Sequence, residues 1–246
     1  MGHYYTQTGE PCYYVPKAKS SDLRDTTIRD AKKLSLVPSV TEILKVADKP
    51  GLNNWLIDQH ILAALTMPRD EDWDSATLLK KVKQDANEQS RTARELGSEI
   101  HNAIEDHFKN KPVTPKYHTI YEAINEVLND EFGPQGWISE KTFSHPLGYG
   151  GKSDLHCDIA VIDFKTTDKP LDGLKCYDEH LMQGAAYKHG HGLSDAVTGN
   201  IFVSTRNIGE VRLILHGDTS RHWEMFKSLL NYWKLAKDYD SGYQPA

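Results

Sequence analysis

Cysteine is scarce in this sequence, and long apolar runs and an excess of positive charge are missing. The three cysteines, Cys12, Cys157 and Cys176, are too few and too scattered for a disulfide framework, so we expect a reducing compartment. With no apolar stretch of membrane-spanning length and no secretory or lipidation signal, we expect a cytoplasmic protein of a bacterial or phage-infected cell, without membrane partners. The formal net charge of −6 argues against indiscriminate coating of nucleic acid.

In the segment 160–166, apolar and polar side chains alternate, as they do in a strand. Asp163 and Lys165 therefore share one face. A tight turn at 158–159 would pair this strand with the preceding segment and place Asp154 directly opposite Asp163. Two carboxylates at that spacing repel each other unless a divalent cation lies between them, and their hard oxygens suit Mg²⁺ or Mn²⁺. A metal site beside a lysine is what a metal-dependent phosphodiester hydrolase requires.

Two predicted helices carry further candidate residues. The segment 86–109 has apolar residues at helical spacing, with His101 at the edge of the apolar stripe. In the segment 178–190, Gln183 and Tyr187 are four residues apart and share a helix face. Taken alone, such a histidine is more typical of a structural boundary residue, and such a pair of a structural hydrogen bond.

The segment around Ser39 has two interpretations. Ser39 and Glu42 have the spacing of a helix capping box, in which each side chain bonds the other residue's amide. A helix N-terminus also offers amides to a phosphate, so Ser39 and Thr41 are candidate substrate contacts. Lys152, in the glycine-rich stretch before Asp154, is a further candidate substrate contact.

The candidate residues occur in an order that resembles a known family. The ordered motifs are Gly97-x-x-x-His101, Glu140, Gly151-x-x-Asp154, Asp163-x-Lys165 and Gln183-x-x-x-Tyr187. This set resembles the PD-(D/E)xK nuclease superfamily in its RecB-like exonuclease branch. Residues 38–44 resemble the opening motif of the mitochondrial genome maintenance exonuclease group and its phage relatives.

The resemblance implies a role for each matched residue. His101, Asp154 and Asp163 would ligate one or two Mg²⁺ or Mn²⁺ ions, and Lys165 would serve the attacking water and the transition state. The catalytic set would be Lys165, Asp163, Asp154 and the acidic Glu140, and Gln183 and Tyr187 would bind the substrate. Together with the candidate contacts Ser39, Thr41 and Lys152, these two complete the expected substrate-binding set.

The resemblance also implies an α/β fold with a restriction-endonuclease-like core: a central mixed sheet flanked by helices, with an N-terminal helical region covering the cleft. Residues 1–35 would form a loose arm and 36–246 a single nuclease domain, comprising a helical region at 36–110 and a sheet core with a C-terminal helix at 136–246. The predicted strands lie near 137–143, 148–157, 160–166, 196–204 and 209–216, and the predicted core helices near 178–190 and 219–239.

The expected activity is that of a DNA exonuclease acting on single strands or duplex ends, in repair, recombination or phage DNA processing. An endonuclease, a nuclease subunit of a recombination complex and a catalytically silent DNA-binding scaffold are alternatives. The best candidate for a basic stripe consists of Lys80, Lys81, Lys83, Arg91 and Arg94, although a solvated helix face explains these residues equally well.

Two other metal centres are less favoured by the sequence. An iron-sulfur cluster, as in some relatives of the superfamily, is not expected because it needs four cysteines and this chain has three. A zinc site formed by His156, Cys157, Cys176 and His180 is conceivable. However, the adjacent His156 and Cys157 would project to opposite sides of a strand.

Overall fold

A computed structural model of the chain describes residues 3–47, 50–68, 70 and 73–241. The chain divides into two compact units, which we call the sheet unit (Met1–Ala47 with Ala103–Ala246) and the helical unit (Asp48–Asn102). In this division, residues 3–35 of the predicted arm and residues 36–47 of the predicted helical region both belong to the sheet unit.

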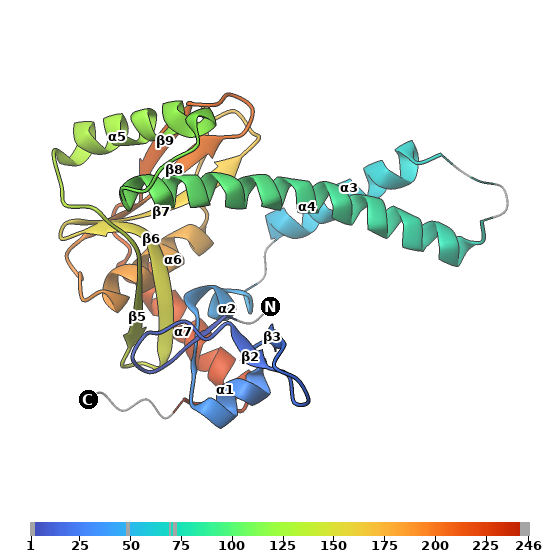
Figure 1. Ribbon diagram of the computed structural model, residues 1–246, viewed down its shortest axis with the longest axis horizontal. Helices are drawn as coiled ribbons and strands as arrows, with labels where there is room; N and C mark the ends of the chain where they lie inside the picture. Colours follow the sequence, from blue (N-terminus) through green and yellow to red (C-terminus); the bar gives the residue numbers. More distant parts are fainter. Residues whose placement is uncertain (1–2, 48–49, 69, 71–72, 242–246) are drawn as a thin grey trace. The chain divides into compact units, whose positions relative to one another are not determined.

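A five-stranded mixed sheet forms the centre of the sheet unit (Figure 1). In spatial order its strands are β5 (Ile138–His145), β6 (Tyr149–Cys157), β7 (Ala160–Thr167), β8 (Val197–Ser204) and β9 (Val211–Leu215). Neighbouring strands are antiparallel except β7 and β8, which are parallel and are connected through a helix. The predicted α/β class with a central mixed sheet flanked by helices is confirmed.

The β6–β7 hairpin forms around the predicted turn at 158–159. Its hydrogen-bonded ladder ends at the pair of Leu155 and Ile162. The next pair in register, Asp154 and Asp163, therefore lies beyond the ladder. We expected Asp154 and Asp163 to be directly opposite each other in the paired strands. This is wrong, because the regular pairing of β6 with β7 stops just before the two acidic residues.

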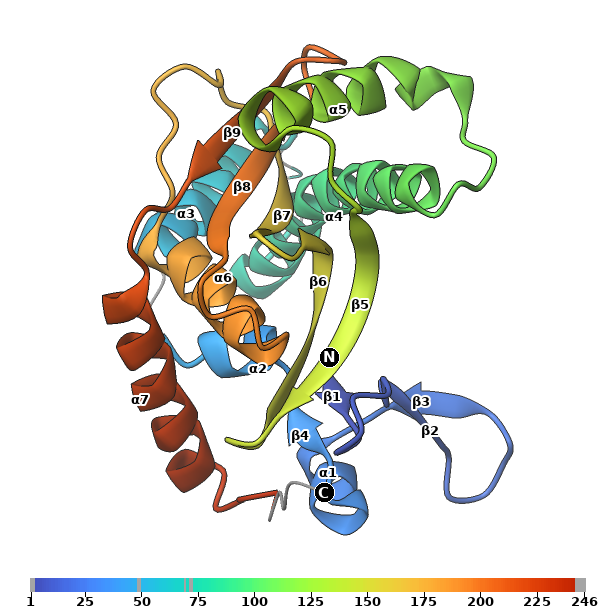
Figure 2. The same cartoon turned by 90° about the vertical axis from the view of Figure 1, so that its left-hand side faces the viewer.

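Two helices and a short third one lie together on one side of the sheet (Figure 2). Helix α6 (Asp178–Gly190) contacts β5 to β8, and it also packs against α7 (Ser220–Ala236) and α2 (Val40–Leu44). The apolar core between these elements includes the side chains of Tyr149, Val161, Met182, Ala186, Phe226 and Trp233. Val161, Asp163 and Lys165 alternate with their neighbours along β7, so the acidic residue and the lysine point toward the side of the sheet that α6 covers.

The opposite face of β7 carries Phe164. Its ring stacks on Phe108, with 6.5 Å between the ring centroids, at the end of α4 (Ser75–Phe108). A short 3₁₀ helix, η1 (Pro115–Tyr117), then leads into α5 (His118–Phe132), which contacts β9. The buried side chains of α5 are Ile120, Tyr121, Ile124 and Leu128.

The N-terminal segment is packed rather than loose. Its elements are β1 (Tyr4–Tyr5), β2 (Tyr14–Pro16), β3 (Leu23–Asp25), α1 (Ile28–Leu34) and β4 (Val37–Pro38), with β1 paired to β4 and β2 to β3. Tyr4 and Tyr5 are only 2% and 3% exposed. The expected loose arm is therefore not observed, and burial of two aromatic rings supplies the stabilisation that holds these residues in place.

The helical unit contains α3 (Pro50–Thr66) and the part of α4 up to residue 102. Its small core comprises Ala63, Val82 and Ala86, with Ala64, Met67 and Leu78 packed against it. Among the helices of the described residues, none combines the length and the apolar character needed to cross a membrane.

Candidate active site

Asp163 and Lys165 form an ion pair on β7. The Lys165 Nζ atom lies 2.6 Å from Asp163 Oδ2. The two residues are two positions apart in a strand, so the pleat places both side chains on one face, as predicted. Asp163 is 6% exposed, and β7 lies between β6 and β8, so this pair is located at the centre of the sheet.

Asp154 joins this group from β6. Its Oδ2 atom accepts a hydrogen bond from the Phe164 amide at 2.8 Å. Because the regular ladder has ended one residue earlier, this amide bonds a side chain instead of a β6 carbonyl. The Asp154 carboxylate is thereby fixed to the backbone between Asp163 and Lys165.

The environment of Lys165 keeps the ammonium charged. Burial opposes the charge, but the carboxylates of Asp163 and Asp154 outweigh that effect and raise the pKa of Lys165 above its usual value. At neutral pH this side chain is therefore a positive charge and a hydrogen-bond donor, and it has no basic lone pair with which to accept a proton.

Gln183 and Tyr187 connect α6 to the lysine. Gln183 Oε1 accepts a hydrogen bond from Lys165 Nζ at 3.0 Å, and Gln183 Nε2 donates to the Tyr187 hydroxyl at 3.0 Å. The two residues are one helical turn apart, so one face of α6 presents both groups. Tyr187 is 5% exposed, and its hydroxyl fixes the amide orientation of Gln183 by accepting this hydrogen bond.

A second group behind Asp163 was not predicted. Asn200 on β8 donates its Nδ2 hydrogens to Asp163 Oδ2 at 2.9 Å and to the Asp163 carbonyl at 3.1 Å. His216 Nε2 in turn lies 2.7 Å from Asn200 Oδ1. The sequence contains one signal for Asn200, a lone polar side chain within the apolar run 199–203, but its partner follows only from the parallel register that pairs Asp163 with Asn200.

Glu140 and Lys152 form an ion pair beside this group. In β5, Ser139 pairs with Leu155 and Lys141 with Ser153, so Glu140 falls in the register position of Asp154 but makes no ladder pair there. Its backbone is left-handed, with φ of 59°. A non-glycine residue in that conformation is uncommon and often marks a functional position.

Ser39 is a helix cap in the structure. Its Oγ accepts a hydrogen bond from the Glu42 amide at 3.0 Å and lies 3.0 Å from the Thr41 hydroxyl. The reciprocal half of the predicted capping box is not formed, because the Ser39 amide donates to the His3 carbonyl and the Glu42 carboxylate pairs with Lys45. Ser39 is buried while Thr41 is exposed, so the two candidate substrate contacts differ in accessibility.

His101 lies in the helical unit, on α4, where it is partly buried. The two carboxylates lie in the sheet unit. The predicted ligand set of one histidine and two aspartates is therefore divided between the two units, and the sheet unit supplies the two carboxylates.

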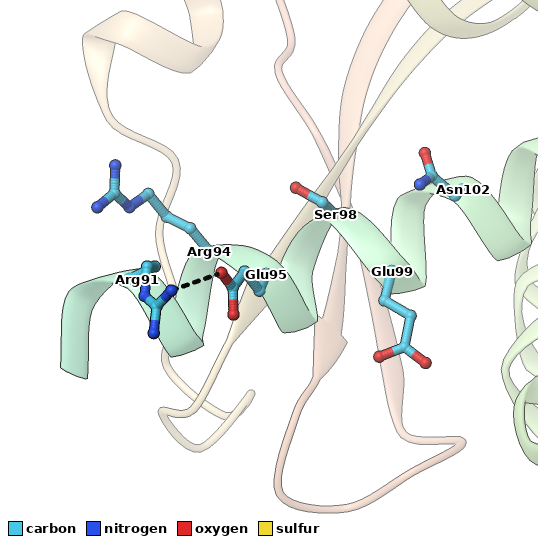
Figure 3. A pocket seen from close by; sticks show the side chains of 6 residues that line it. All are labelled: Arg91, Arg94, Glu95, Ser98, Glu99 and Asn102. Carbon is cyan, nitrogen blue, oxygen red and sulfur yellow. Dashed lines mark ion pairs between the residues drawn. The ribbon is translucent and has the colours of Figure 1, made fainter. Parts of the chain in front are cut away.

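A hollow on α4 within the helical unit is lined by mixed charges (Figure 3). Its lining residues are Arg91, Arg94, Glu95, Ser98, Glu99 and Asn102. Arg91 lies 2.8 Å from a Glu88 oxygen and 3.8 Å from a Glu95 oxygen, while Lys81 lies over the Trp73 ring at 4.2 Å. Acidic residues lie between the cations of the predicted basic stripe, so its positive potential is weaker than the five cations alone would give.

The carboxylate pair fits a hard divalent cation. Within the part of the chain that is described, no group of three or more His, Cys, Asp or Glu side chains is gathered into a possible metal site. Mg²⁺ commonly takes only one or two protein carboxylates and completes its shell with water and substrate phosphate oxygens. Asp154 and Asp163 match that donor set, whereas a structural zinc ion takes four protein ligands.

Comparisons with known proteins identify no family for this chain. No protein-family model matches it, and no curated protein matches it. Among solved structures, one titled "Crystal structure of SSO0001" is similar over 74% of this chain and 86% of that one, with 13% sequence identity and a TM-score of 0.34.

Proposed function

We propose that this protein is a Mg²⁺- or Mn²⁺-dependent nuclease that hydrolyses phosphodiester bonds of DNA from free ends. The observation that carries the proposal is the convergence of Asp154, Asp163 and Lys165 at the centre of the sheet, with Gln183 holding the lysine. The two carboxylates offer ligands for a divalent cation and the lysine adds a positive charge, which is the equipment that metal-dependent phosphodiester hydrolysis uses. The order of the motifs, which resembles that of PD-(D/E)xK nucleases, supports the same proposal.

Asp154 and Asp163 would hold the ion. When bound, it supplies positive charge that polarises the phosphate and lowers the pKa of a water molecule. Lys165 remains protonated at neutral pH, so its role is to stabilise negative charge on the attacking water or on the phosphoryl oxygens. Gln183 restricts the rotamers of Lys165 and thereby reduces the entropy lost when the ammonium engages the substrate.

The preference for free ends rests on the resemblance to the RecB-like exonuclease branch. It is tested with one single-stranded DNA in two forms, an end-labelled linear molecule and a covalently closed circle of the same sequence. A time course is run with Mg²⁺, with Mn²⁺ and with a chelator. We expect the linear form to be degraded with either metal, the circle to persist, and the chelator to stop the reaction.

Each other outcome supports a different function. Equal loss of the linear and circular forms would show an endonuclease. If neither form is cleaved with either metal, and calorimetry detects no binding of Mg²⁺ or Mn²⁺, the proposal is wrong and the catalytically silent scaffold becomes the favoured alternative.

A further inference from the structure

A chain of hydrogen bonds runs from the interior of the sheet unit to Asp163. Thr198 Oγ1 lies 2.9 Å from His216 Nδ1, His216 Nε2 lies 2.7 Å from Asn200 Oδ1, and Asn200 Nδ2 lies 2.9 Å from Asp163 Oδ2. We call Thr198, His216 and Asn200 the relay. Thr198 and Asn200 are each 1% exposed, so these bonds do not compete with bulk water.

The direction of every bond in the relay follows from the chemistry of its members. The side chain and carbonyl of Asp163 offer only acceptor oxygens to Asn200, so the Asn200 amide nitrogen must face Asp163. The Asn200 oxygen then faces His216 and accepts, so His216 Nε2 must carry a proton. Burial, with a contribution from nearby His180, lowers the pKa of His216 to about 4, so the ring is neutral at pH 7. Its Nδ1 is then an acceptor, and Thr198 donates to it.

We propose that the relay is a positioning device for Asp163, in which Asn200 holds Asp163 Oδ2, the Nε2 proton of His216 fixes the Asn200 amide, and the Thr198 hydroxyl anchors the His216 ring by donating to Nδ1. This inference rests on the proposed function, because it assigns the relay the task of presenting the other Asp163 oxygen to a divalent cation. Lys165 also contacts Oδ2, so within the described residues both partners engage the same oxygen, and Oδ1 is the oxygen left for an ion. Groups that orient a metal ligand in this way commonly govern metal affinity.

The fold makes room for the relay at Gly184. A Cβ at that position would lie 3.0 Å from Thr198 Cβ and 3.1 Å from His216 Nδ1. Any larger residue at position 184 would therefore press on Thr198 and His216. Glycine in a helix interior is less favourable than alanine, and this close approach gives a reason for it.

The threonine anchors the histidine in its place in the relay. A hydroxyl both donates and accepts, so Thr198 follows the tautomer that Asp163 and Asn200 impose on His216. Without the hydroxyl, the buried Nδ1 acceptor loses its donor and the ring loses its bond to β8. His216 then holds the Asn200 amide, and through it the Asp163 carboxylate, less firmly.

The test compares Thr198→Val, which keeps the shape and removes the hydroxyl, with Thr198→Ser, which keeps the hydroxyl. Calorimetry with Mn²⁺ and no DNA gives the metal affinity. We expect Thr198→Val to bind Mn²⁺ about 10-fold more weakly than the unaltered protein and Thr198→Ser to differ by less than about twofold. Equal Mn²⁺ affinities in all three proteins would overturn the proposal.

A second measurement uses the unaltered protein and so does not depend on a variant that folds. Nitrogen NMR of His216 should show a directly bonded proton on Nε2 and none on Nδ1 at pH 7. A proton on Nδ1 would overturn the relay, even if the protein cleaves DNA. If the proton is on Nε2 but the unaltered protein neither binds Mn²⁺ nor cleaves DNA, the hydrogen-bond direction stands, while the proposed function and the relay's role toward a cation both fail.

Discussion

Lys165 Nζ lies 2.6 Å from Asp163 Oδ2, on the same face of the central strand β7. The positive charge of Lys165 thus reduces the repulsion between the carboxylates of Asp154 and Asp163. In the proposed function, its ammonium also offers positive charge to a phosphodiester at the acidic pair. Both consequences can be measured.

Lys165→Met removes the ammonium and keeps much of the aliphatic length. We expect DNA cleavage under single-turnover conditions to fall by about 10²–10³-fold, the usual loss when one preorganised donor to a developing negative charge is removed. The matched control is Lys169→Met, at an exposed position just after β7. If both variants cleave at the unaltered rate, Lys165 takes no part in the reaction.

Asp154→Ala removes a carboxylate that is fixed to the Phe164 amide. With one of two protein ligands lost, we expect binding of Mg²⁺ and Mn²⁺ to become undetectable by calorimetry. Asp158→Ala, at the exposed turn of the same hairpin, should bind both ions like the unaltered protein. Normal ion binding by Asp154→Ala would exclude this residue from the metal site.

His191 should make the fold sensitive to acid. Burial, with nearby His156 and Lys141, lowers its pKa to about 3, and its ring stacks on His156 with 4.3 Å between centroids. An unfolded histidine takes up a proton near pH 6.5, whereas the folded one stays neutral down to about pH 3. Stability is therefore unaffected by this group above pH 6.5, and it falls progressively as the pH is lowered from 6.5 toward 3. Between pH 7 and pH 5 the free energy of unfolding should fall by about 2 kcal/mol less in His191→Gln than in the unaltered protein, as measured by denaturant unfolding at the two pH values. An equal loss in both proteins would contradict this assignment.

Gly151 is required for close packing next to the site. A Cβ there would lie 2.6 Å from Phe143 Cζ and 3.1 Å from Tyr187 Cε1. We expect Gly151→Ala to lower the free energy of unfolding by about 1–3 kcal/mol, because the two rings must shift. The control Gly136→Ala meets no atom within 4 Å and should change stability by less than about 0.5 kcal/mol. Thermal or denaturant unfolding of the two variants measures the difference, and equal stabilities would show that the rings yield without cost.

Local periodicity was sufficient to predict much of the sheet unit. The alternation along 160–166 predicted the shared face of Asp163 and Lys165, and the turn at 158–159 predicted the hairpin, because both depend on neighbours in the sequence. The helix at 178–190 was predicted within the bounds that α6 has. Helix α5 is not among the predicted elements, although Ile120, Ile124 and Leu128 have helical spacing and are buried.

The remaining features depend on contacts between distant parts of the chain. Asn200 meets Asp163 only because β8 runs parallel to β7, and His216 reaches Asn200 only because β9 returns beside β8. The N-terminal segment has strands of two or three residues, which are too short to show a period, and it is ordered by the burial of Tyr4 and Tyr5. No local pattern specifies these partners.

Cleavage of end-labelled single-stranded DNA with Mg²⁺ or Mn²⁺ by Asp163→Asn tests the central claim most directly. Its control is Asp168→Asn, at a position whose side chain is 70% exposed and pairs with Arg206. The account predicts that Asp163→Asn folds but shows no cleavage, while Asp168→Asn cleaves like the unaltered protein. Normal cleavage by a folded Asp163→Asn would contradict it.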